Sequence, residues 1–423
     1  MKRFLVALAA AVAVIGCARP EENLTAPAEL ASLSASARNN YRIYQVNPRL
    51  FSTGSQLKAV EKRLDEIAAL GTDVLYLMPI YTEGKEKSVG SPYCIRDYKG
   101  VKSECGTLQD VKSLVNAAHD RGMLVMFDWV ANHTAWDNAW VTEHPEWYEK
   151  DKDGNIVYPT KDGAWTDVAQ LDYSSAALQD AMTDAMKYWI TEADIDGYRC
   201  DYAHGVADAF WVKAIAELKA LKPGFLMLAE SDYEKMFTDG FDIIYDRSLK
   251  ASARKLFAGG EASDFASAYK RTQANTPQGK TKLYFVTNHD DASEKSPVTE
   301  FGGKDAAFAA FSLLAALNGS PMLYSSQETG YGSPVNFFRT LKVDWNADSA
   351  LTSRYKEVLS ALEDADRDGE CHLLLAESVL FVQYGSGLLV GINTGGSAVK
   401  VLLPDGAPKR SASFSACEVK VWK

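Results

Sequence analysis

The stretch TEADIDGYRCDYAHGV (191–206) places charged side chains inside a short apolar run that is typical of a buried strand. Side chains two residues apart share one face of a strand, so Arg199 and Asp201 point one way and Cys200 points the other. A charged pair that faces a common interior indicates either a functional site or a structural ion pair.

Similar apolar, β-prone runs recur on both sides of this stretch, and each leads toward an amphipathic helical segment such as LQDVKSLVNAAHDRG. Eight strands that alternate with helices predict an α/β fold, a parallel (β/α)8 TIM barrel, over residues 41–340. The gap between the third and fourth runs is long, which predicts an insertion at about 133–175. The eight runs are YRIYQVNPRLF (41–51), TDVLYLMPI (72–80), LVMFDWV (124–130), GYRCDY (197–202), FLMLAES (225–231), FDIIYD (241–246), TKLYFVTNHD (281–290) and SPMLYSSQE (320–328).

The pattern changes after the last of these runs. HLLLAESVLFVQYGSGLLVGINTGGSAVKVLLPDG and SASFSACEVKVWK contain short strands separated by Gly, Asn and Asp turns. We therefore expect residues 341–423 to form a small all-β sandwich domain packed against the barrel.

The first residues have the features of an export signal. MKRFLVALAAAVAVIGC (1–17) has a basic start and an apolar stretch too short to span a bilayer. Its last four residues resemble a bacterial lipobox, which predicts lipidation of Cys17; the alternative is a plain secretory peptide cut nearby. Residues 18–40 are small, polar and Pro-containing, which predicts a flexible tether. We expect a cell-envelope, outer-membrane lipoprotein, periplasmic or surface-facing, whose only membrane contact is the lipid anchor.

Composition limits the partners and the redox chemistry. The net charge of -11, without a dense Lys/Arg run beyond the first residues, argues against nucleic acid as a partner. We expect a monomer. Cys94 and Cys105 close a short loop, and an oxidising envelope would permit a disulfide there that contributes about 3 kcal/mol. Cys200 is the candidate for a free thiol.

Ionisable residues collect at the carboxyl ends of the predicted strands, where barrels carry their active sites. Each such residue alone is common, since a strand-end Asp often caps a helix and a lone His is usually structural. Their convergence on one rim is what indicates a site. The set comprises Asp128, Asn132 and His133 after strand three, Arg199, Asp201 and His204 at strand four, Glu230 at strand five, and Asn288, His289 and Asp290 after strand seven.

Two chemistries suit this rim. Metal-assisted hydrolysis needs several His and Asp ligands, but the chain has no HxH or HExxH pair. Retaining glycoside cleavage needs two carboxyl groups about 5–5.5 Å apart, a separation that neighbouring barrel strands can provide. Asp201 and Glu230 end strands four and five, so glycoside cleavage fits better.

The motifs themselves resemble those of the alpha-amylase family, glycoside hydrolase family 13. The resemblance extends over residues 41–423, and four motifs in order make it specific. The four are DWVANHT (128–134), DGYRCD (196–201), LMLAES (226–231) and FVTNHD (285–290), with GSPYCIRDYKGV (90–101) and the domain B motif VAQLDY (168–173) in support.

This resemblance implies a role for each matching residue. Asp201 matches the nucleophile, Glu230 the general acid/base, and Asp290 the third carboxylate, which helps to bind and distort the sugar. Arg199 matches the arginine that keeps the nucleophile ionised. The remaining matches concern the substrate and its supports: His133 and His289 for sugar hydroxyls, Tyr93 for a stacking platform, and Asp128 and Asn132 for first-motif support.

The sequence departs from the family pattern after the nucleophile. Many amylases have Lys and then His at the third and fourth positions, where this chain has His204 and Gly205. His204 is a candidate for the lost sugar contact, or alternatively a structural histidine. The chemistry itself requires no cofactor. Asn132 matches a usual calcium ligand, so calcium is a candidate ion, whereas DKDGN in the insertion fits a solvated turn better.

The function that follows is hydrolysis of α-1,4-glucosidic bonds in starch or maltooligosaccharides with retention of configuration. One alternative is a transglycosylase or a trehalose-forming relative, which shares these residues. The other is an inactive glucan-binding surface lipoprotein, against which the intact set Asp201, Glu230 and Asp290 argues.

Overall fold

A computed structural model describes residues 24–35, 40–363 and 369–423 of the chain. The predicted signal peptide, the lipidation site Cys17 and part of the predicted tether lie outside the described residues. Within them, no helix combines the length and the apolar character that crossing a membrane requires.

Eight parallel strands close into a barrel, and they are the eight runs that the sequence predicts. Each strand pairs with the next along the chain, and the last pairs with the first. The strands are β2 (Ile43–Val46), β3 (Val74–Leu77), β6 (Leu124–Val130), β9 (Gly197–Asp201), β10 (Leu226–Ala229), β11 (Ile243–Tyr245), β12 (Thr281–Tyr284) and β13 (Ser320–Tyr324).

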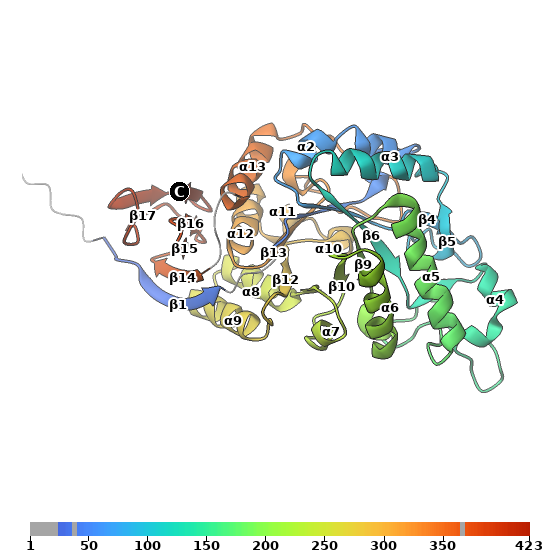
Figure 1. Ribbon diagram of the computed structural model, residues 1–423. Coiled ribbons are helices and arrows are strands. Elements are labelled where there is room, and N and C mark those ends of the chain that lie inside the picture. The colour runs from blue at the N-terminus through green and yellow to red at the C-terminus, as the bar shows by residue number, and fades with distance from the viewer. Residues whose placement is uncertain (1–23, 36–39, 364–368) are drawn as a thin grey trace, which may run out of the picture.

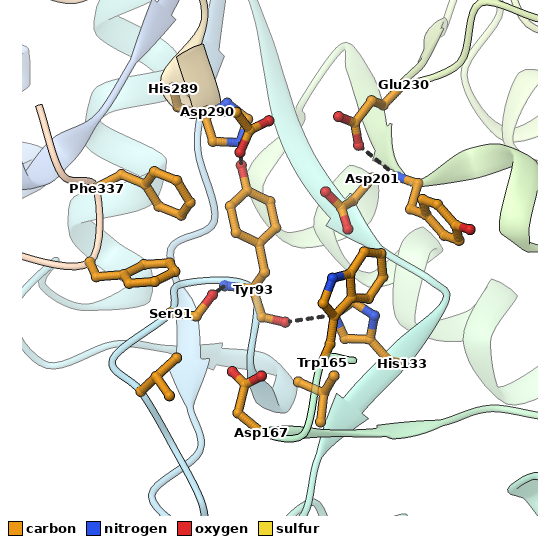
Figure 2. Close-up of a pocket in the computed structure, with 14 residues that line it drawn as sticks. Ser91, Tyr93, His133, Trp165, Asp167, Asp201, Glu230, His289, Asp290 and Phe337 are labelled. Atoms are coloured by element: carbon orange, nitrogen blue, oxygen red, sulfur yellow. Dashed lines mark hydrogen bonds and ion pairs between the residues drawn. The ribbon is translucent and has the colours of Figure 1, made fainter. Parts of the chain in front are cut away.

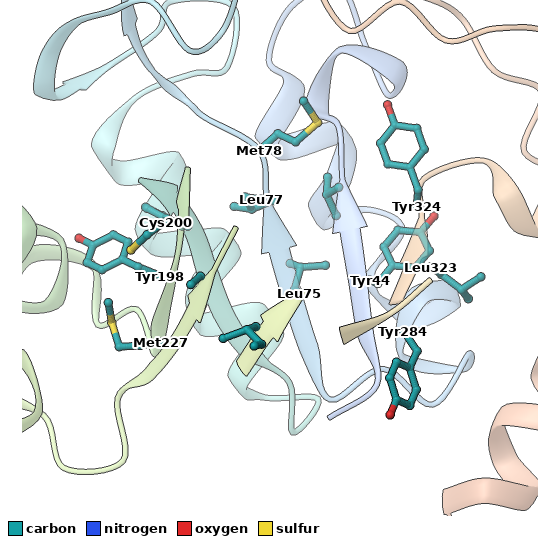
Figure 3. Close-up of a cluster of buried hydrophobic side chains, with 14 of the residues drawn as sticks. Tyr44, Leu75, Leu77, Met78, Tyr198, Cys200, Met227, Tyr284, Leu323 and Tyr324 are labelled. Carbon is teal, nitrogen blue, oxygen red and sulfur yellow. The ribbon is translucent and has the colours of Figure 1, made fainter. Parts of the chain in front are cut away.

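Helices surround this barrel (Figure 1). Alternation along the strands produces two buried layers: one set of side chains fills the barrel, and the other packs outward against the helices. Figure 3 shows the outward layer, in which Leu75, Leu77, Tyr198 and Cys200 lie together. The α-helices are α1 (Gln56–Glu61), α2 (Leu64–Ala68), α3 (Leu108–His119), α4 (Ala139–Glu143), α5 (Ala176–Ala193), α6 (Asp208–Leu221), α7 (Lys235–Thr238), α8 (Arg247–Phe257), α9 (Ala262–Ala274), α10 (His289–Glu294), α11 (Pro297–Glu300), α12 (Lys304–Ala316) and α13 (Ser349–Glu363), with 3-10 turns η1 (Pro48–Leu50), η2 (Pro145–Trp147), η3 (Ala203–Gly205) and η4 (Gln327–Thr329).

The segment after the third barrel strand is an excursion with a small sheet of its own. Strands β7 (His133–Ala135) and β8 (Val168–Gln170) pair in antiparallel fashion, and α4 and η2 lie between them. A second antiparallel pair, β4 (Tyr81–Glu83) and β5 (Ile95–Val101), follows the second barrel strand. These two additions stand over the carboxyl ends of the barrel strands and form one wall of the site described below.

The C-terminal strands form antiparallel sheets, in agreement with the predicted all-β domain, but the predicted start of that domain at residue 341 is wrong, because helix α13 precedes the strands. Helix α13 comes first and packs on the barrel, since the ring of Tyr355 lies 5.0 Å from that of Phe308 on α12. A five-stranded sheet and the hairpin β17–β18 then enclose a separate core around Phe381 and Phe414. The strands are β14 (Gly369–Ala376), β15 (Val379–Tyr384), β16 (Leu389–Asn393), β17 (Val399–Leu402), β18 (Ser411–Phe414) and β19 (Val419–Trp422).

The fifth strand of that sheet comes from the other end of the chain. Residues 28–35, expected to belong to a flexible tether, form β1 (Ala28–Ala35), which pairs with β14 in antiparallel fashion. Figure 1 shows β1 (blue) beside β14 (red). The expectation of a tether is wrong for these residues. Their Ala- and Ser-rich composition does not predict a strand, and the open edge of β14 supplies the backbone partners that sequence reasoning could not see.

The expected disulfide between Cys94 and Cys105 is not formed, and both thiols are free and buried. The thiol of Cys94 donates to the carbonyl oxygen of Asp167, and that of Cys105 donates to Gln56. The two cysteines flank β5, whose seven extended residues rise about 3.3 Å each, so the loop does not bring its ends together. Cys200 is free, as predicted, and lies fully buried in the outward layer.

Candidate active site

A cavity of about 270 Å³ opens at the carboxyl ends of the barrel strands. Figure 2 shows Asp201 and Glu230 together on one side of it, and Asp290 and Tyr93 on the other. The sequence analysis singled out Tyr93, His133, Asp201, Glu230, His289 and Asp290; the other lining residues are Val89, Ser91, Trp165, Asp167, Val168, Tyr202, Phe337 and Phe338.

Arg199 lies beneath the cavity and links the carboxylates. Its Nη1 is 2.7 Å from Asp128 Oδ1 and 2.9 Å from Asp201 Oδ1, and its Nη2 is 3.0 Å from Glu230 Oε2. Burial opposes the charge on Arg199, but Asp128 and Glu230 outweigh it and raise the pKa of the guanidinium well above its usual value. The ion pair inferred from residues 199 and 201 is therefore present, and it forms part of the site.

Asp201 ends β9 and is almost buried. Desolvation and the neighbouring Glu230 raise the pKa of Asp201 well above its usual range, and Arg199 opposes them. Asp290, in the first turn of α10, is half-exposed, and partial desolvation raises its pKa as well. The site thus brings three carboxyl groups to one cavity, and Arg199 contacts two of them, Asp201 and Glu230.

Glu230 follows β10, and donors reach both of its carboxyl oxygens. Oε2 accepts the backbone N–H of Tyr202 at 2.9 Å, and Oε1 accepts from Arg247 Nη2 at 2.9 Å. Tyr202 adopts the left-handed conformation (φ 42°, ψ 44°), which is rare for a side chain of this size. This turn, directly after Asp201, aims the Tyr202 N–H at Glu230.

The two histidines at the cavity are neutral at physiological pH. Burial lowers the pKa of His133 to about 4, and burial together with Arg199 lowers that of His289 to about 3. Both have protein partners. His133 Nε2 is 3.2 Å from the carbonyl oxygen of Tyr93, and His289 Nε2 is 2.7 Å from the hydroxyl of Tyr93.

A chain of hydrogen bonds fixes the floor of the cavity. Gln45 Nε2 lies 2.9 Å from His289 Nδ1, so that nitrogen accepts and Nε2 of the neutral ring donates to the Tyr93 hydroxyl. The hydroxyl of Tyr93 in turn donates to Asp128 Oδ2 at 2.9 Å, and Tyr76 donates to the same oxygen at 2.6 Å. Asp128 has no exposed surface and does not line the cavity, so it supports Arg199 and Tyr93 and does not touch substrate.

Comparison with known proteins agrees with this geometry. Residues 42–217 match a family model described as "Alpha amylase, catalytic domain". An alpha-amylase from Lactobacillus plantarum has the same fold, with a TM-score of 0.79 at 27% identity over 90% of this chain and 98% of that one. The chain belongs to the alpha-amylase family, glycoside hydrolase family 13.

Two further relatives are similar to this chain over part of their length. Alpha-amylase MalA of Haloarcula japonica is 30% identical over 338 residues, which is 76% of this chain and 48% of that protein. An alpha-1,4-glucan:maltose-1-phosphate maltosyltransferase of Rhodospirillum rubrum is 34% identical over 192 residues, which is 40% of this chain and 27% of that protein. The chain thus spans half or less of the length of these two relatives.

The calcium site that an alpha-amylase resemblance implies does not fit Asn132. Its amide lies against Gln170: Asn132 Oδ1 is 3.3 Å from Gln170 Nε2, and Asn132 Nδ2 is 3.4 Å from Gln170 Oε1. Gln170 Nε2 also donates to the carbonyl oxygen of Asn132 at 3.0 Å. Calcium takes six to eight oxygens, usually several from carboxylates. Within the described part of the chain, no group of three or more His, Cys, Asp or Glu side chains is placed to hold a metal.

His204 lies outside the set that lines the cavity. Its ring is 4.4 Å from that of Tyr202 and 5.3 Å from that of Tyr233, and its Nε2 is 3.6 Å from Asp162 Oδ2. Its Nδ1 is buried without a hydrogen-bond partner among the described residues. A sugar contact by His204 therefore stays a prediction, and the structure shows its packing role.

Sequence reasoning missed several contributors to the site, among them Trp165, Tyr202 and Arg247. Trp165 comes from the inserted segment, and its ring lies 5.7 Å from His133 and 5.0 Å from Tyr202. Tyr202 was detectable as the neighbour of Asp201, but its left-handed backbone was not. Arg247 follows the sixth strand run directly, at the same rim as the other ionisable residues, so its position was an available signal.

Proposed function

We propose that this chain is a retaining α-glucan hydrolase that cleaves α-1,4-glucosidic bonds in starch or maltooligosaccharides. The observation that carries the proposal is the contact of one guanidinium, that of Arg199, with both Asp201 and Glu230. A single side chain that touches both carboxyl groups supports the short separation of a retaining enzyme, about 5–5.5 Å, over the 6.5–9.5 Å of an inverting one.

In the first half-reaction Asp201 attacks C1 of the sugar and forms a covalent glycosyl ester. The bond from C1 to the glycosidic oxygen breaks, and Glu230 gives its proton to that oxygen. In the second half-reaction water attacks C1, the ester bond breaks, and Glu230 takes the proton of the water. Arg199 stabilises the negative charge that Asp201 carries before attack and after release.

The rest of the cavity would hold the ring in place. Tyr93 presents an aromatic ring to the cavity, and Asp290 stands opposite Asp201, where a carboxylate can accept hydroxyl hydrogen bonds. The cavity also has an apolar rim formed by Trp165, Phe337 and Phe338. Apolar sugar faces pack well on such rings, and the few polar groups fix the orientation.

The maltosyltransferase relative raises a second candidate, transfer of a maltosyl unit to or from phosphate. The acid/base marks the side of the leaving group. A phosphate on the leaving-group side would lie near the carboxylates of Glu230 and Asp232. The neighbouring cation, Arg247, already forms ion pairs with both of them. Two carboxylates that share one arginine disfavour an anionic leaving group, so the site favours hydrolysis or transfer between neutral sugars.

The test is to incubate the purified protein with maltoheptaose and follow the products by chromatography and the anomeric protons by NMR. We expect shorter maltooligosaccharides that appear first as the α-anomer. Asp201→Asn should lower kcat by about four orders of magnitude or more while the protein still folds. Glu230→Gln should lose far more activity on maltoheptaose than on α-maltosyl fluoride, whose leaving group needs little protonation. A β-anomer as first product would contradict retention, and near-wild-type activity of Asp201→Asn would contradict the assignment of the nucleophile.

A further inference from the structure

Arg247 touches the acid/base and has no role in the scheme above. It is the first residue of α8, directly after the Asp246 cap, whose carboxylate accepts the N–H of Leu249 at 2.9 Å. Its Nη2 is 2.9 Å from Glu230 Oε1. Its side chain is 42% exposed, so it stands at the rim between Glu230 and solvent.

Two contacts of the guanidinium and one of the backbone hold Arg247 in this place. Its Nη1 donates to Asp232 Oδ2 at 2.8 Å, and its backbone N–H donates to Asp232 Oδ1 at 2.7 Å. The guanidinium also lies over the ring of Tyr245, 4.8 Å from the centroid. Burial opposes its charge, but Glu230 and Asp232 outweigh it and raise the pKa of Arg247, so this group is charged at every working pH.

The hydrogen-bond donors around Glu230 fit one form of its carboxyl group, ionised or protonated, better than the other. Oε2 faces the Tyr202 N–H and Arg199, and neither of these can accept a proton. Oε1 faces Arg247, which cannot accept one either. A carboxylate whose two oxygens both accept hydrogen bonds has its hydrogen-bonding needs met. A carboxylic acid, in contrast, has to direct its own O–H toward an acceptor. Arg247 therefore supports the ionised form, which is the one that acts as a base.

We propose that Arg247 is a positioning residue for Glu230, and that it favours the second half-reaction, in which Glu230 removes a proton from water. The inference rests on the proposed retaining hydrolysis. In that step the water oxygen bonds to C1, the bond from C1 to Asp201 breaks with its electron pair returning to the carboxylate, and the proton of the water passes to Glu230. Arg247 donates to Glu230 Oε1 and so holds the carboxyl group in the place where it accepts that proton.

The experiment separates the two half-reactions with α-maltosyl fluoride, since the departure of fluoride needs little acid assistance. Rapid-quench kinetics give the rate of glycosyl-ester formation, the steady state gives its breakdown, and intact mass after quenching shows the ester on the protein. For Arg247→Gln we expect ester formation within about threefold of wild type, steady-state kcat at least about tenfold lower, and accumulation of the ester.

Two additions exclude a merely structural effect. Azide attacks C1 without giving up a proton, so it should restore turnover of Arg247→Gln and yield α-maltosyl azide. Arg247→Lys keeps a charge without the fork geometry and should fall within about fivefold of wild type. Arg254→Gln on the same helix, whose Nη1 is 3.5 Å from Glu300, is the matched control and should behave as wild type.

The outcomes are distinct. If wild type hydrolyses the fluoride and Arg247→Gln matches it in both phases, the inference is overturned and the proposed function stands. A rise in KM for long oligosaccharides without ester accumulation makes Arg247 a sugar contact and also overturns it. If Arg247→Gln loses both ester formation and steady-state turnover and azide does not restore turnover, Arg247 is a structural residue and the inference is overturned. A wild type that forms no ester and turns nothing over overturns the proposed function itself.

Discussion

Arg199 and Asp128 form an ion pair with 2.7 Å between Nη1 and Oδ1, and neither side chain has any exposed surface. The pair lies below the cavity, so Asp128 counters the charge of Arg199 from the side away from the sugar. Desolvation raises the pKa of Asp128, opposed by Arg199. Asp128 thus adds a third carboxylate to the two, Asp201 and Glu230, that already contact this buried cation.

We expect Asp128→Asn to destabilise the fold by about 3 kcal/mol, because it leaves part of the Arg199 charge buried without its partner. Urea unfolding at pH 7 measures this loss. The matched control is Asp65→Asn, which removes a pair of the same 2.7 Å length between Asp65 and Arg121, with Asp65 82% exposed. That change should cost less than about 1 kcal/mol. Equal losses of unfolding free energy in the two variants would show that the buried pair contributes no more to stability than the exposed one.

Gly205 should be required for the geometry of Glu230. A Cβ at this position would lie 2.1 Å from the ring of Tyr202, so the ring would have to move, and with it the N–H that holds Glu230. Gly205→Ala should therefore lower kcat about tenfold or more. Gly54→Ala, where the added Cβ meets nothing within 4 Å, is the control. Unchanged kcat in Gly205→Ala would show that the Tyr202 turn does not position the acid/base.

The Asn132–Gln170 contact predicts stability that does not depend on calcium. We expect EDTA and added calcium to shift the Tm of the wild type by less than about 1 °C, since Asn132 faces an amide and no carboxylate cluster. Gln170→Ala should lower the Tm by several degrees, about 2–4 °C per kcal/mol lost, equally with and without calcium. A Tm that rises with calcium concentration would contradict this prediction.

The buried histidines predict acid sensitivity of the fold. The pKa of His133 is lowered to about 4 and that of His289 to about 3, while an unfolded histidine titrates near 6.5. Between these values the unfolded chain binds more protons, so stability rises with pH and is lost as pH falls from about 6.5 toward 3–4. Each histidine accounts for about 2–3 kcal/mol of this loss by pH 4.5.

Replacing one of them isolates its share. His289→Gln should give a flatter dependence of unfolding free energy on pH between 7 and 4.5, whatever its effect at pH 7. His144→Gln is the control, because His144 is 42% exposed and its ion-pair partner Glu146 is exposed as well. Parallel curves for wild type and His289→Gln would show that burial of this ring does not shift its titration.

Cys17 lies outside the described residues, and its lipidation remains our proposal. We expect the mature protein to carry a diacylglycerol group on Cys17 and to sediment with membranes. Two or three acyl chains anchor a protein stably, and Cys17→Ser would leave it with none. The variant should therefore appear in the soluble fraction. Intact mass of the membrane-extracted protein checks this, and an unlipidated Cys17 in the mature protein would contradict it.

The sequence by itself determined the barrel and which ionisable residues gather at its rim. All eight strand runs became barrel strands, because alternation of period two and the helices between them leave few ways to bury both faces. The same periodicity placed Arg199 and Asp201 on the inner face and Cys200 on the outer one, as β9 has them. Asp201, Glu230 and Asp290 reached one cavity because the carboxyl ends of parallel strands share one rim.

Only the tertiary structure decided the contacts between segments that are distant in sequence. Arg247 meets Glu230 because strands five and six of the barrel are neighbours, and nothing local to either residue specifies the pair. Trp165 reaches His133 because the inserted segment folds back over the cavity. Strand β1 forms because the edge of β14 is open to it, more than 300 residues away. Such pairings depend on where the folded chain brings side chains and strand edges, whereas local periodicity fixes only which face a residue occupies.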